Sequence, residues 1–400
     1  MFRLSQFMQE IDNPTPVRNA KPPGPVVIWN LIRRCNLNCK HCYSISADTD
    51  FPGELSTDQV FTVMDDLKGF KVPVLILSGG EPLLRPDIFE ISRHAKAMGF
   101  YVALSTNGTL IDEETADRIA EIGYDYLGIS LDGIGAVHDR FRRQDGAFDA
   151  SMRGIHLCHD RGIKVGVRYT MTEGNIESLN GILDLVEDEN IDKFYLSHLV
   201  YAGRGNRNRG DDAAHRTTRD AMDLMFERCW DYVKRGEPKE FVTGNNDADG
   251  VYFLMWVEKH FPHRADHIRA KLEAWGGNAS GVNVANIDNL GTVHPDTMWW
   301  HHDLGNVKER PFSEIWSDVS DPIMAGLKAN PRRIKGRCGE CSHFAICGGN
   351  TRVRAQRLTG DPWEEDPACY LSDAEIGVTG GQRVVNRPYK GKSDEAAVLR

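Results

Sequence analysis

Three cysteines stand close together near the N-terminus in the pattern C-x3-C-x2-C. They are Cys35, Cys39 and Cys42, and an apolar run over residues 26–32 leads into them. Thiolates with this spacing hold three irons of a [4Fe-4S] cluster and leave the fourth iron without a protein ligand. A structural metal site closes its coordination shell, whereas an open position suits a site that transforms a bound molecule. Zinc with a distant fourth ligand is the alternative, although zinc sites usually use paired C-x2-C motifs.

A second cysteine group lies near the C-terminus. It consists of Cys338, Cys341, Cys347 and Cys369, spaced C-x2-C-x5-C-x21-C. Four thiolates make a closed site, and on geometry alone this site suits a [4Fe-4S] cluster or zinc equally well. The two groups contain all but two of the nine cysteines. We therefore expect metal binding rather than disulfides, and a reducing, cytoplasmic location.

The composition narrows the classes of partner. A chain of 400 residues is long enough for two or three domains. It carries 48 basic and 58 acidic residues, and this formal charge of −10 argues against binding to nucleic acid or to an anionic membrane. No apolar run approaches the roughly 20 residues that a membrane-spanning helix needs, and no secretory signal is recognisable at the start. We expect no nucleic-acid partner and no membrane partner.

Strand-like and helix-like stretches alternate between residues 26 and 199. Apolar strand patterns cover 26–32, 72–77, 101–104, 126–129, 165–169 and 194–199. Helical patterns cover 87–98, 112–122, 148–160 and 176–189, and Ser56 is suited to cap a further helix. This alternation predicts a parallel sheet covered by helices, with the loops that follow the strands gathered at one edge. The pattern alone fits an open sheet or a barrel.

The motifs that follow these strands resemble those of the radical S-adenosylmethionine (SAM) enzymes. The C-x3-C-x2-C loop comes after the first strand, and Gly79-Gly80-Glu81-Pro82, which is similar to the GGEP motif of that family, comes after the second. The resemblance implies an α/β fold, a partial (β/α)6 barrel of TIM type. In that family the amino and carboxylate groups of SAM chelate the open iron, and one electron cleaves SAM to methionine and a 5′-deoxyadenosyl radical. The three cysteines of the loop are then the catalytic cluster ligands.

The same resemblance implies a SAM pocket at the ends of the strands. The expected SAM-contacting residues are Gly79, Gly80, Glu81, Asn107, Ser130, Asp132 and Arg168. Glu81 and nearby backbone carbonyls would accept hydrogen bonds from the SAM ammonium group. Arg168, a charge inside an apolar strand, would pair with the SAM carboxylate. The structural alternatives are ordinary strand-to-helix turns and a salt bridge inside the barrel.

The run 341–350 in the second cysteine group resembles the C-terminal SPASM domain of radical SAM enzymes. Those domains typically hold two auxiliary clusters, and the spacing here fits the outer one. Thr351 stands where a further cysteine would follow, and Asp296 stands where another often occurs. We therefore expect one auxiliary [4Fe-4S] cluster, with zinc as the alternative. The lack of these cysteines puts in doubt functions that need two auxiliary clusters, such as thioether formation.

Basic and aromatic residues predict a substrate-binding region at one end of the barrel. Residues 202–210 interleave arginine with glycine and asparagine, which predicts a flexible basic loop able to clamp carboxylates or phosphates. Arg140, Arg142 and Arg143 would add to this rim. The segment 298–302 supplies aromatic surfaces and imidazoles suited to a macrocycle. The candidate substrate ligands are Arg204, Arg207, Arg209, His301 and His302. A solvated charged loop and a plain hydrophobic strand are the alternatives.

Over residues 1–375 the chain is similar to the radical SAM enzymes of heme d1 biosynthesis. This resemblance implies an anionic tetrapyrrole substrate, 12,18-didecarboxysiroheme, from which two propionate side chains are removed. It also implies a low-potential electron donor that reduces the SAM-binding cluster. Three alternatives stay open: a tetrapyrrole enzyme of the siroheme-dependent heme pathway, a SPASM-type peptide-maturing enzyme, and a non-catalytic iron–sulfur or zinc scaffold.

The sequence divides into five expected parts. They are an irregular N-terminal extension (1–24), the radical SAM partial barrel (25–210), a helical bridge (211–280), a SPASM-like auxiliary cluster domain (281–376) and a flexible tail (377–400).

Overall fold

A curved sheet forms the centre of the computed structural model, which describes residues 1–18, 22–237, 239–379 and 384–385. The order across the sheet is β7-β6-β5-β4-β3-β2-β1-β8-β9. The strands are β1 (Val26–Asn30), β2 (Val74–Ser78), β3 (Tyr101–Thr106), β4 (Tyr126–Ser130), β5 (Val165–Met171), β6 (Lys193–His198), β7 (Glu240–Gly244), β8 (Val284–Ile287) and β9 (Val293–His294). Neighbouring strands are parallel except β8 and β9, which pair antiparallel.

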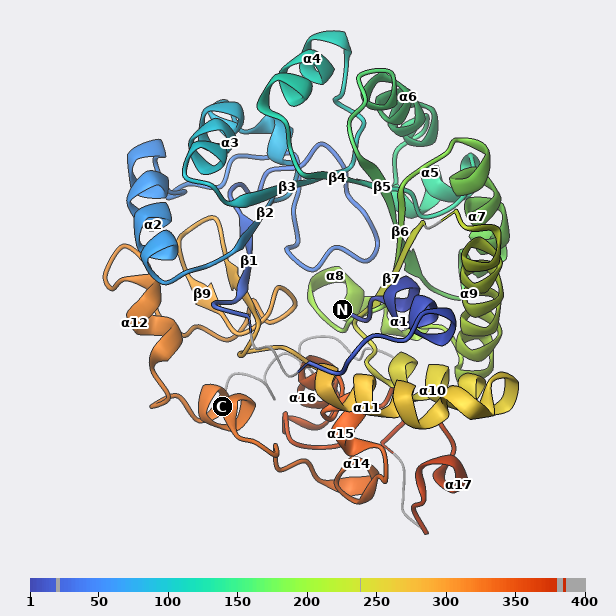
Figure 1. The fold of residues 1–400 in the computed structure, drawn as a ribbon. Helices are drawn as coiled ribbons and strands as arrows, with labels where there is room; N and C mark the ends of the chain where they lie inside the picture. The colour runs from blue at the N-terminus through green and yellow to red at the C-terminus, as the bar shows by residue number, and fades with distance from the viewer. Residues whose placement is uncertain (19–21, 238, 380–383, 386–400) are drawn as a thin grey trace.

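Helices cover the convex side of this sheet (Figure 1). They are α2 (Thr57–Gly69), α3 (Ile88–Ala97), α4 (Glu113–Ile122), α6 (Ala147–His159), α7 (Leu179–Asp188) and α9 (His215–Arg235). Ser56 caps α2 through a capping box with Gln59, as its position predicted. Within the described residues β7 and β9 stand at opposite edges of the sheet. The expectation of a partial barrel built from parallel βα units is therefore confirmed.

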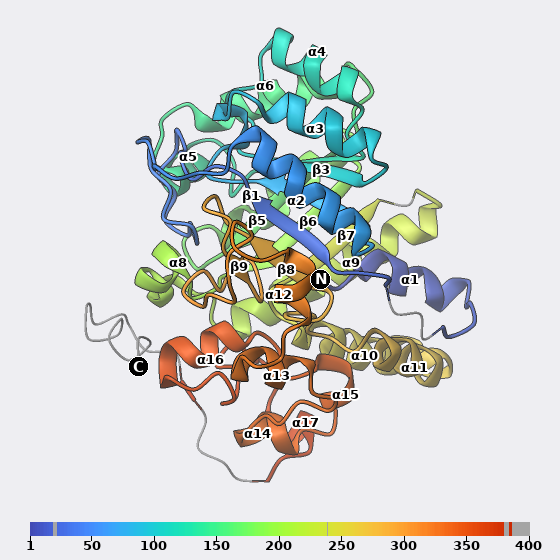
Figure 2. The same cartoon turned by 90° about the vertical axis from the view of Figure 1, so that its left-hand side faces the viewer.

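The other helices are shorter or lie at the ends of the barrel. They are α1 (Leu4–Asp12), α5 (Ala136–Arg142), α8 (Gly203–Arg207), α10 (Ala248–His260), α11 (Ala265–Trp275), α12 (Phe312–Ser317), α13 (Pro322–Lys328), α14 (Gly336–Glu340), α15 (Phe344–Cys347), α16 (Arg352–Thr359) and α17 (Asp373–Ile376). Four 3-10 helices cover Pro82–Leu84, Ile176–Ser178, Arg209–Asp211 and Pro262–Arg264. Helices α13 to α17 lie together below the sheet in Figure 2. Of the part that the structure describes, no helix is both long and apolar enough to cross a membrane.

Three of the expected parts differ from the structure. The N-terminal extension is not wholly irregular, because it contains α1, and Phe2 exchanges backbone hydrogen bonds with Thr243 of β7. The helical bridge contains β7, which pairs with β6. The part from residue 281 onward adds β8 and β9 to the barrel sheet, beside β1. The strands β7, β8 and β9 are too short for a periodic signal, and pairing with a distant strand decides their conformation. Most of the expected tail lies outside the described residues.

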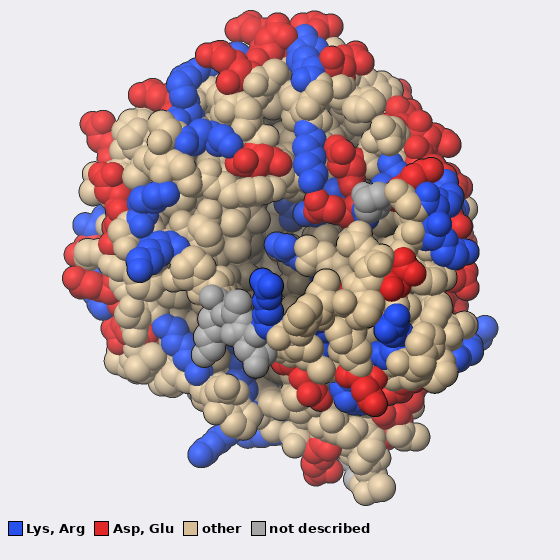
Figure 3. Space-filling model, viewed as in Figure 1, with Lys and Arg blue, Asp and Glu red and all other residues tan. Residues whose placement is uncertain are grey.

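The face of the molecule seen in Figure 3 is hollowed near its centre, within the arc of the strands. Basic and acidic side chains are interspersed around this face, so no single sign of charge dominates it. The side view separates the two ends of the barrel (Figure 2). The loop after β1 and helix α8 lie at one end, where the strands finish, and α1 lies at the other.

Two glycines after β2 let the loop after β1 approach closely. A Cβ atom on Gly79 would lie 2.5 Å from the carbonyl oxygen of Ile32, and one on Gly80 would lie 2.2 Å from that of Arg34. The backbones are joined there, because the N–H of Gly80 donates to Ile32 (2.6 Å) and that of Glu81 donates to Arg34 (2.9 Å). A side chain at either glycine would push the loop away from the sheet.

Replacing Gly80 with alanine is expected to destabilise the fold by about 1–3 kcal/mol, the usual range for forcing an extra carbon into a packed site. The matched control is Gly69→Ala, because a Cβ at Gly69 meets nothing within 4 Å and alanine is the better helix former. Denaturant unfolding of both variants beside the parent measures the difference. Equal midpoints for Gly80→Ala and the parent would show that the loop moves without strain.

Candidate iron–sulfur and SAM site

The three N-terminal cysteines lie in the loop of residues 31–47, named here the cluster loop. Cys35 and Cys39 are each 7% exposed and Cys42 is half-buried. Burial raises the pKa of the Cys35 thiol, and charges on Cys39 and Cys42 raise it further, so the three sulfurs lie near one another. The backbone N–H of Leu37 donates to the Cys35 sulfur at 3.4 Å. The structure therefore brings the three predicted ligands together at the end of β1.

The surroundings of these sulfurs suit thiolate ligands. Arg142 donates a hydrogen bond to the Cys39 sulfur at 3.5 Å, and the Ser44 hydroxyl lies 3.2 Å from the Cys42 sulfur. Such donors stabilise the negative charge that a sulfur carries when it binds iron. Among the described residues no three His, Cys, Asp or Glu side chains are grouped so that they could hold a single metal ion. The assignment of a [4Fe-4S] cluster therefore rests on the cysteine spacing and on these donors, which fit it.

Glu81 ties the ends of two strands together. Its side chain is fully buried, and it accepts hydrogen bonds from the Thr106 hydroxyl (2.7 Å) and from the backbone N–H groups of Asn107 (2.8 Å) and Leu83 (3.1 Å). Burial raises the pKa of this carboxyl, and the hydrogen bonds oppose that rise. Both oxygens thus have protein donors in this structure, and acceptance of a hydrogen bond from the SAM ammonium group stays a prediction.

Asn107 and Asp132 also turn toward the protein. Asn107 donates to the side-chain oxygen of Asn36 in the cluster loop (2.9 Å) and accepts from Thr109. Asp132 is fully buried, accepts from the N–H of Thr170 (2.6 Å) and forms an ion pair with Arg142. In this structure the Asp132 carboxylate is thus engaged with Thr170 and Arg142 inside the barrel wall, and its contact with ribose stays a prediction.

Ser130 and Arg168, two of the expected SAM contacts, lie side by side in the sheet. They are register partners on β4 and β5, and both are half-buried. Arg168 donates to the hydroxyl of Ser105, and its guanidinium lies 5.2 Å from the centre of the Tyr195 ring. In the part of the chain that the structure describes, no carboxylate is paired with Arg168, which sets aside the alternative of a salt bridge inside the barrel.

The predicted flexible basic loop is instead helix α8 followed by a 3-10 helix. Arg204 is 9% exposed and donates to the carbonyl oxygens of Cys39 (2.6 Å) and Ser46 (2.8 Å). Arg209 is 3% exposed and donates to Asn206 (2.9 Å), whereas Arg207 is exposed. A substrate clamp made of Arg204 and Arg209 is therefore wrong. Arg204 fastens the cluster loop to the end of β6, because its acceptors are carbonyls of that loop.

Only part of the aromatic segment 298–302 faces the cluster loop. Trp299 is fully buried and donates to Gln356 (2.6 Å), which His301 also contacts (2.8 Å). Burial lowers the pKa of His301 to about 3, so its imidazole is neutral. His302 pairs with Asp321 at 3.0 Å. Both histidines thus already have protein partners.

Trp300 is the exception in this segment. Its ring centre lies 5.9 Å from that of Tyr43, which directly follows Cys42, and it stacks on His294 with an interplanar angle of 11°. Tyr43 in turn accepts a hydrogen bond from Asn30 at the end of β1 (2.8 Å). Trp300 is therefore the residue that brings the aromatic segment against the cluster loop.

The four C-terminal cysteines also come together. Burial raises the pKa of the Cys347 thiol, and charges on Cys338, Cys341 and Cys369 raise it further. Arg352 opposes the rise at Cys338, whose pKa reaches about 12, and the N–H of His343 donates to the Cys341 sulfur at 3.4 Å. A cation and a backbone donor beside these thiols suit thiolate ligands, although the described side chains are not grouped to hold a single metal ion.

Asp296, at a position where SPASM domains often have a cysteine, has hydrogen-bond partners within the protein. It accepts hydrogen bonds from the Ser280 hydroxyl and from the backbone N–H of Met298 (2.8 Å). Arg332 lies nearby, and burial lowers its pKa to about 10 while the charge of Asp296 opposes this. A hydrogen-bonded polar network thus surrounds this position.

Sequence reasoning placed Arg142 on the substrate rim, but the structure buries it against the cluster loop. The side chain is 7% exposed, whereas Arg140, on the same helix α5, is exposed. The signal that could have separated them is helical periodicity, since residues i and i+2 of a helix point to different sides. The sequence does not show which face of α5 packs inward, so three arginines within four residues predict a single charged surface.

Comparisons with known proteins agree with this geometry. The family model of the radical SAM superfamily matches residues 29–188. The pre-heme d1 synthase of Dinoroseobacter shibae is 58% identical over 98% of each chain, and the Fe-coproporphyrin III synthase of Methanosarcina barkeri is 45% identical over 90% of each. The crystal structure of Streptococcus suis SuiB bound to S-adenosylmethionine has a TM-score of 0.69 and 18% identity, and the match covers 87% of this chain and 78% of that one. The chain belongs to the radical SAM superfamily, in the family that includes pre-heme d1 synthase.

Proposed function

We propose that this radical SAM enzyme acts in heme d1 biosynthesis and removes propionate side chains from 12,18-didecarboxysiroheme. The observation that carries the proposal is the 58% identity to a pre-heme d1 synthase along nearly the whole of both chains. Identity of this extent covers the cluster loop, the barrel and the second cysteine group together, rather than one shared domain. A low-potential electron donor is the partner that the first step requires.

When bound, the cluster and SAM supply a 5′-deoxyadenosyl radical, which abstracts hydrogen from a substrate C–H bond. The protein's part is to hold the cluster loop at the open ends of the strands and to present ligand-binding groups there. Ser130 and Arg168 are the proposed contacts for the polar groups of SAM, since Arg168 is a cation without a carboxylate partner among the described residues. We assign Cys35, Cys39 and Cys42 as the cluster ligands.

Trp300 is the proposed surface for the macrocycle. It is the aromatic side chain that joins the segment 298–302 to the cluster loop, through its contact with Tyr43. A large flat ring stacks favourably on such a surface. His301 and His302 are less suited to bind the macrocycle, because their ring nitrogens lie 2.8 Å from Gln356 and 3.0 Å from Asp321.

The test of the substrate is an anaerobic incubation with SAM, a reductant and 12,18-didecarboxysiroheme, followed by mass spectrometry of the tetrapyrrole. We expect mass loss from the propionate chains together with 5′-deoxyadenosine. Fe-coproporphyrin III formation instead would move the enzyme to the reaction that the 45% identical relative's name describes. Production of 5′-deoxyadenosine with an unchanged macrocycle would overturn the substrate but keep the radical SAM chemistry. No 5′-deoxyadenosine at all would favour a non-catalytic scaffold.

We further propose that Cys338, Cys341, Cys347 and Cys369 would hold an auxiliary [4Fe-4S] cluster, which would supply an electron acceptor for the substrate. With two clusters the protein binds about eight irons per chain, and Cys341→Ala is expected to lower this to about four. The buried Cys229→Ala is the matched control, because Cys229 lies on α9 outside both groups. Iron analysis after anaerobic reconstitution measures this. An unchanged iron content with bound zinc in the parent would replace the cluster by a zinc site.

A further inference from the structure

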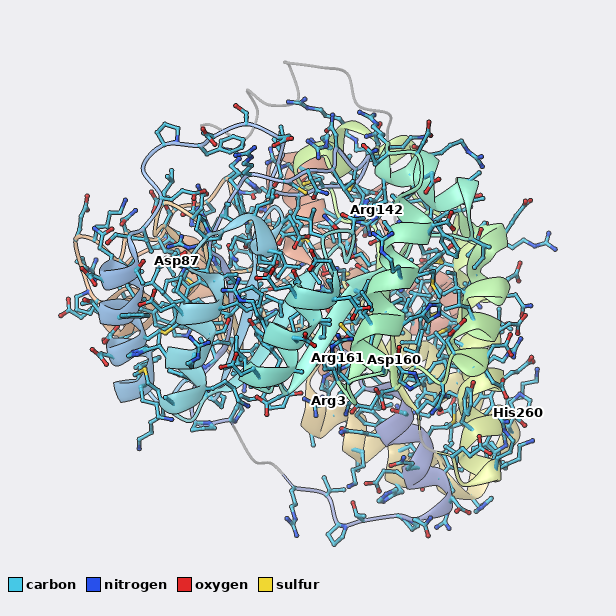
Figure 4. All side chains as sticks on the ribbon, turned by 90° about the horizontal axis from the view of Figure 1, so that it is seen from above. Arg3, Asp87, Arg142, Asp160, Arg161 and His260 are labelled. Atoms are coloured by element: carbon cyan, nitrogen blue, oxygen red, sulfur yellow. The ribbon has the colours of Figure 1, made fainter. Side chains whose placement is uncertain are left out.

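Arg142 occupies a buried position between a cluster ligand and a carboxylate. It is the last residue of α5, and it lies near one end of the barrel while Arg3 and Arg161 lie toward the other (Figure 4). One terminal nitrogen donates to the Cys39 sulfur at 3.5 Å, and the other forms an ion pair with Asp132. Arg142 is 7% exposed and Asp132 is not exposed at all. The guanidinium therefore acts on Cys39 through a medium that screens charge poorly.

The surrounding backbone holds this arrangement in place. Asp132 accepts from the N–H of Thr170 on β5 (2.6 Å), and Asn175 donates to its carbonyl oxygen (3.0 Å). The N–H of Lys40, next to Cys39, donates to the carbonyl of Phe141, next to Arg142, at 3.2 Å. Because both ends of the contact are fixed, the guanidinium stays at the Cys39 sulfur rather than turning toward solvent.

Arg142 thus places a buried positive charge and a hydrogen-bond donor at the sulfur of one cysteine ligand. A reduced cluster carries one more negative charge than an oxidised one. Hydrogen bonds and positive charge at the ligand sulfurs favour the reduced form and raise the reduction potential.

We infer that the Arg142–Asp132 pair sets the reduction potential of the SAM-binding cluster. Arg142 raises the potential through its hydrogen bond and charge at Cys39, and Asp132 both aims the guanidinium and offsets part of its charge. Arg142 is a positioning residue, since it acts through a ligand sulfur and not on substrate. The inference rests on the cluster assignment and is independent of the proposed tetrapyrrole, because the measurement below contains none.

The experiment is an anaerobic redox titration of the reconstituted full chain, followed by electron paramagnetic resonance. The signal that changes when SAM is added belongs to the cluster with the open iron, which separates it from any auxiliary cluster. For Arg142→Gln we expect about tenfold less reduced cluster at a given solution potential, equivalent to a midpoint about 59 mV more negative for one electron. Arg140→Gln is the matched control on the same helix, and its midpoint is expected to equal that of the parent.

Asp132→Asn is expected to shift the midpoint potential in the opposite direction to Arg142→Gln. It keeps the size of the side chain and an oxygen that can accept from the guanidinium, and it removes the negative charge. The Arg142 charge is then less offset, and the midpoint is expected to become more positive. An Arg142→Gln midpoint equal to or more positive than the parent's overturns the inference. If Arg142→Gln binds no iron, Asp132→Asn decides: a positive shift supports the inference, and an unchanged or negative one overturns it. A purely structural role would alter iron content without moving the midpoint of the cluster that assembles.

Discussion

The close approach of the cluster loop to Gly79 and Gly80 is the constraint on which the site depends. The two backbones are hydrogen-bonded where a side chain would have to stand, so the loop continues the pairing of β1 with β2 past the ends of the strands. The three cysteines are thereby presented at the edge where all the βα loops gather. In this structure the glycines of the GGEP-like motif serve this contact, in addition to any approach of a ligand to their backbone.

A set of buried polar side chains then fastens the same loop on its other sides. Glu81 links β2 to β3, Asn107 reaches Asn36, and Arg204 reaches the carbonyls of Cys39 and Ser46. Buried polar groups are tolerated only when they are hydrogen-bonded, and each of these contacts meets that requirement. Glu81 and Asn107, which a motif comparison assigns to SAM binding, therefore also fix the backbone around the cluster loop.

Local signals in the sequence were sufficient for the βα core and for the cysteine groups. The six strands between residues 26 and 199 and the Ser56 cap follow from apolar runs and capping chemistry, which depend on near neighbours. These local signals did not predict the five-residue strand β7 or the buried contacts of Arg204. Pairing of β7 requires β6 as a template, and the acceptors of Arg204 are backbone carbonyls that leave no mark in the sequence. Charge composition alone cannot distinguish a solvated arginine from one that binds carbonyls in the interior.

The second cysteine group is held to the barrel by directional polar contacts as well as by apolar packing. Arg354 and Asp366 form an ion pair in which neither side chain is exposed, and Arg354 also donates to the carbonyl of Leu199, just after β6 (3.0 Å). Tyr370, the neighbour of Cys369, donates to Asp249, which pairs with His198 at the end of β6. Breaking a buried pair leaves an uncompensated charge and is strongly unfavourable, so such contacts permit little sliding between the two parts. A fixed separation between this cysteine group and the ends of the barrel strands follows, which is the condition that electron exchange between a substrate and an auxiliary cluster would require.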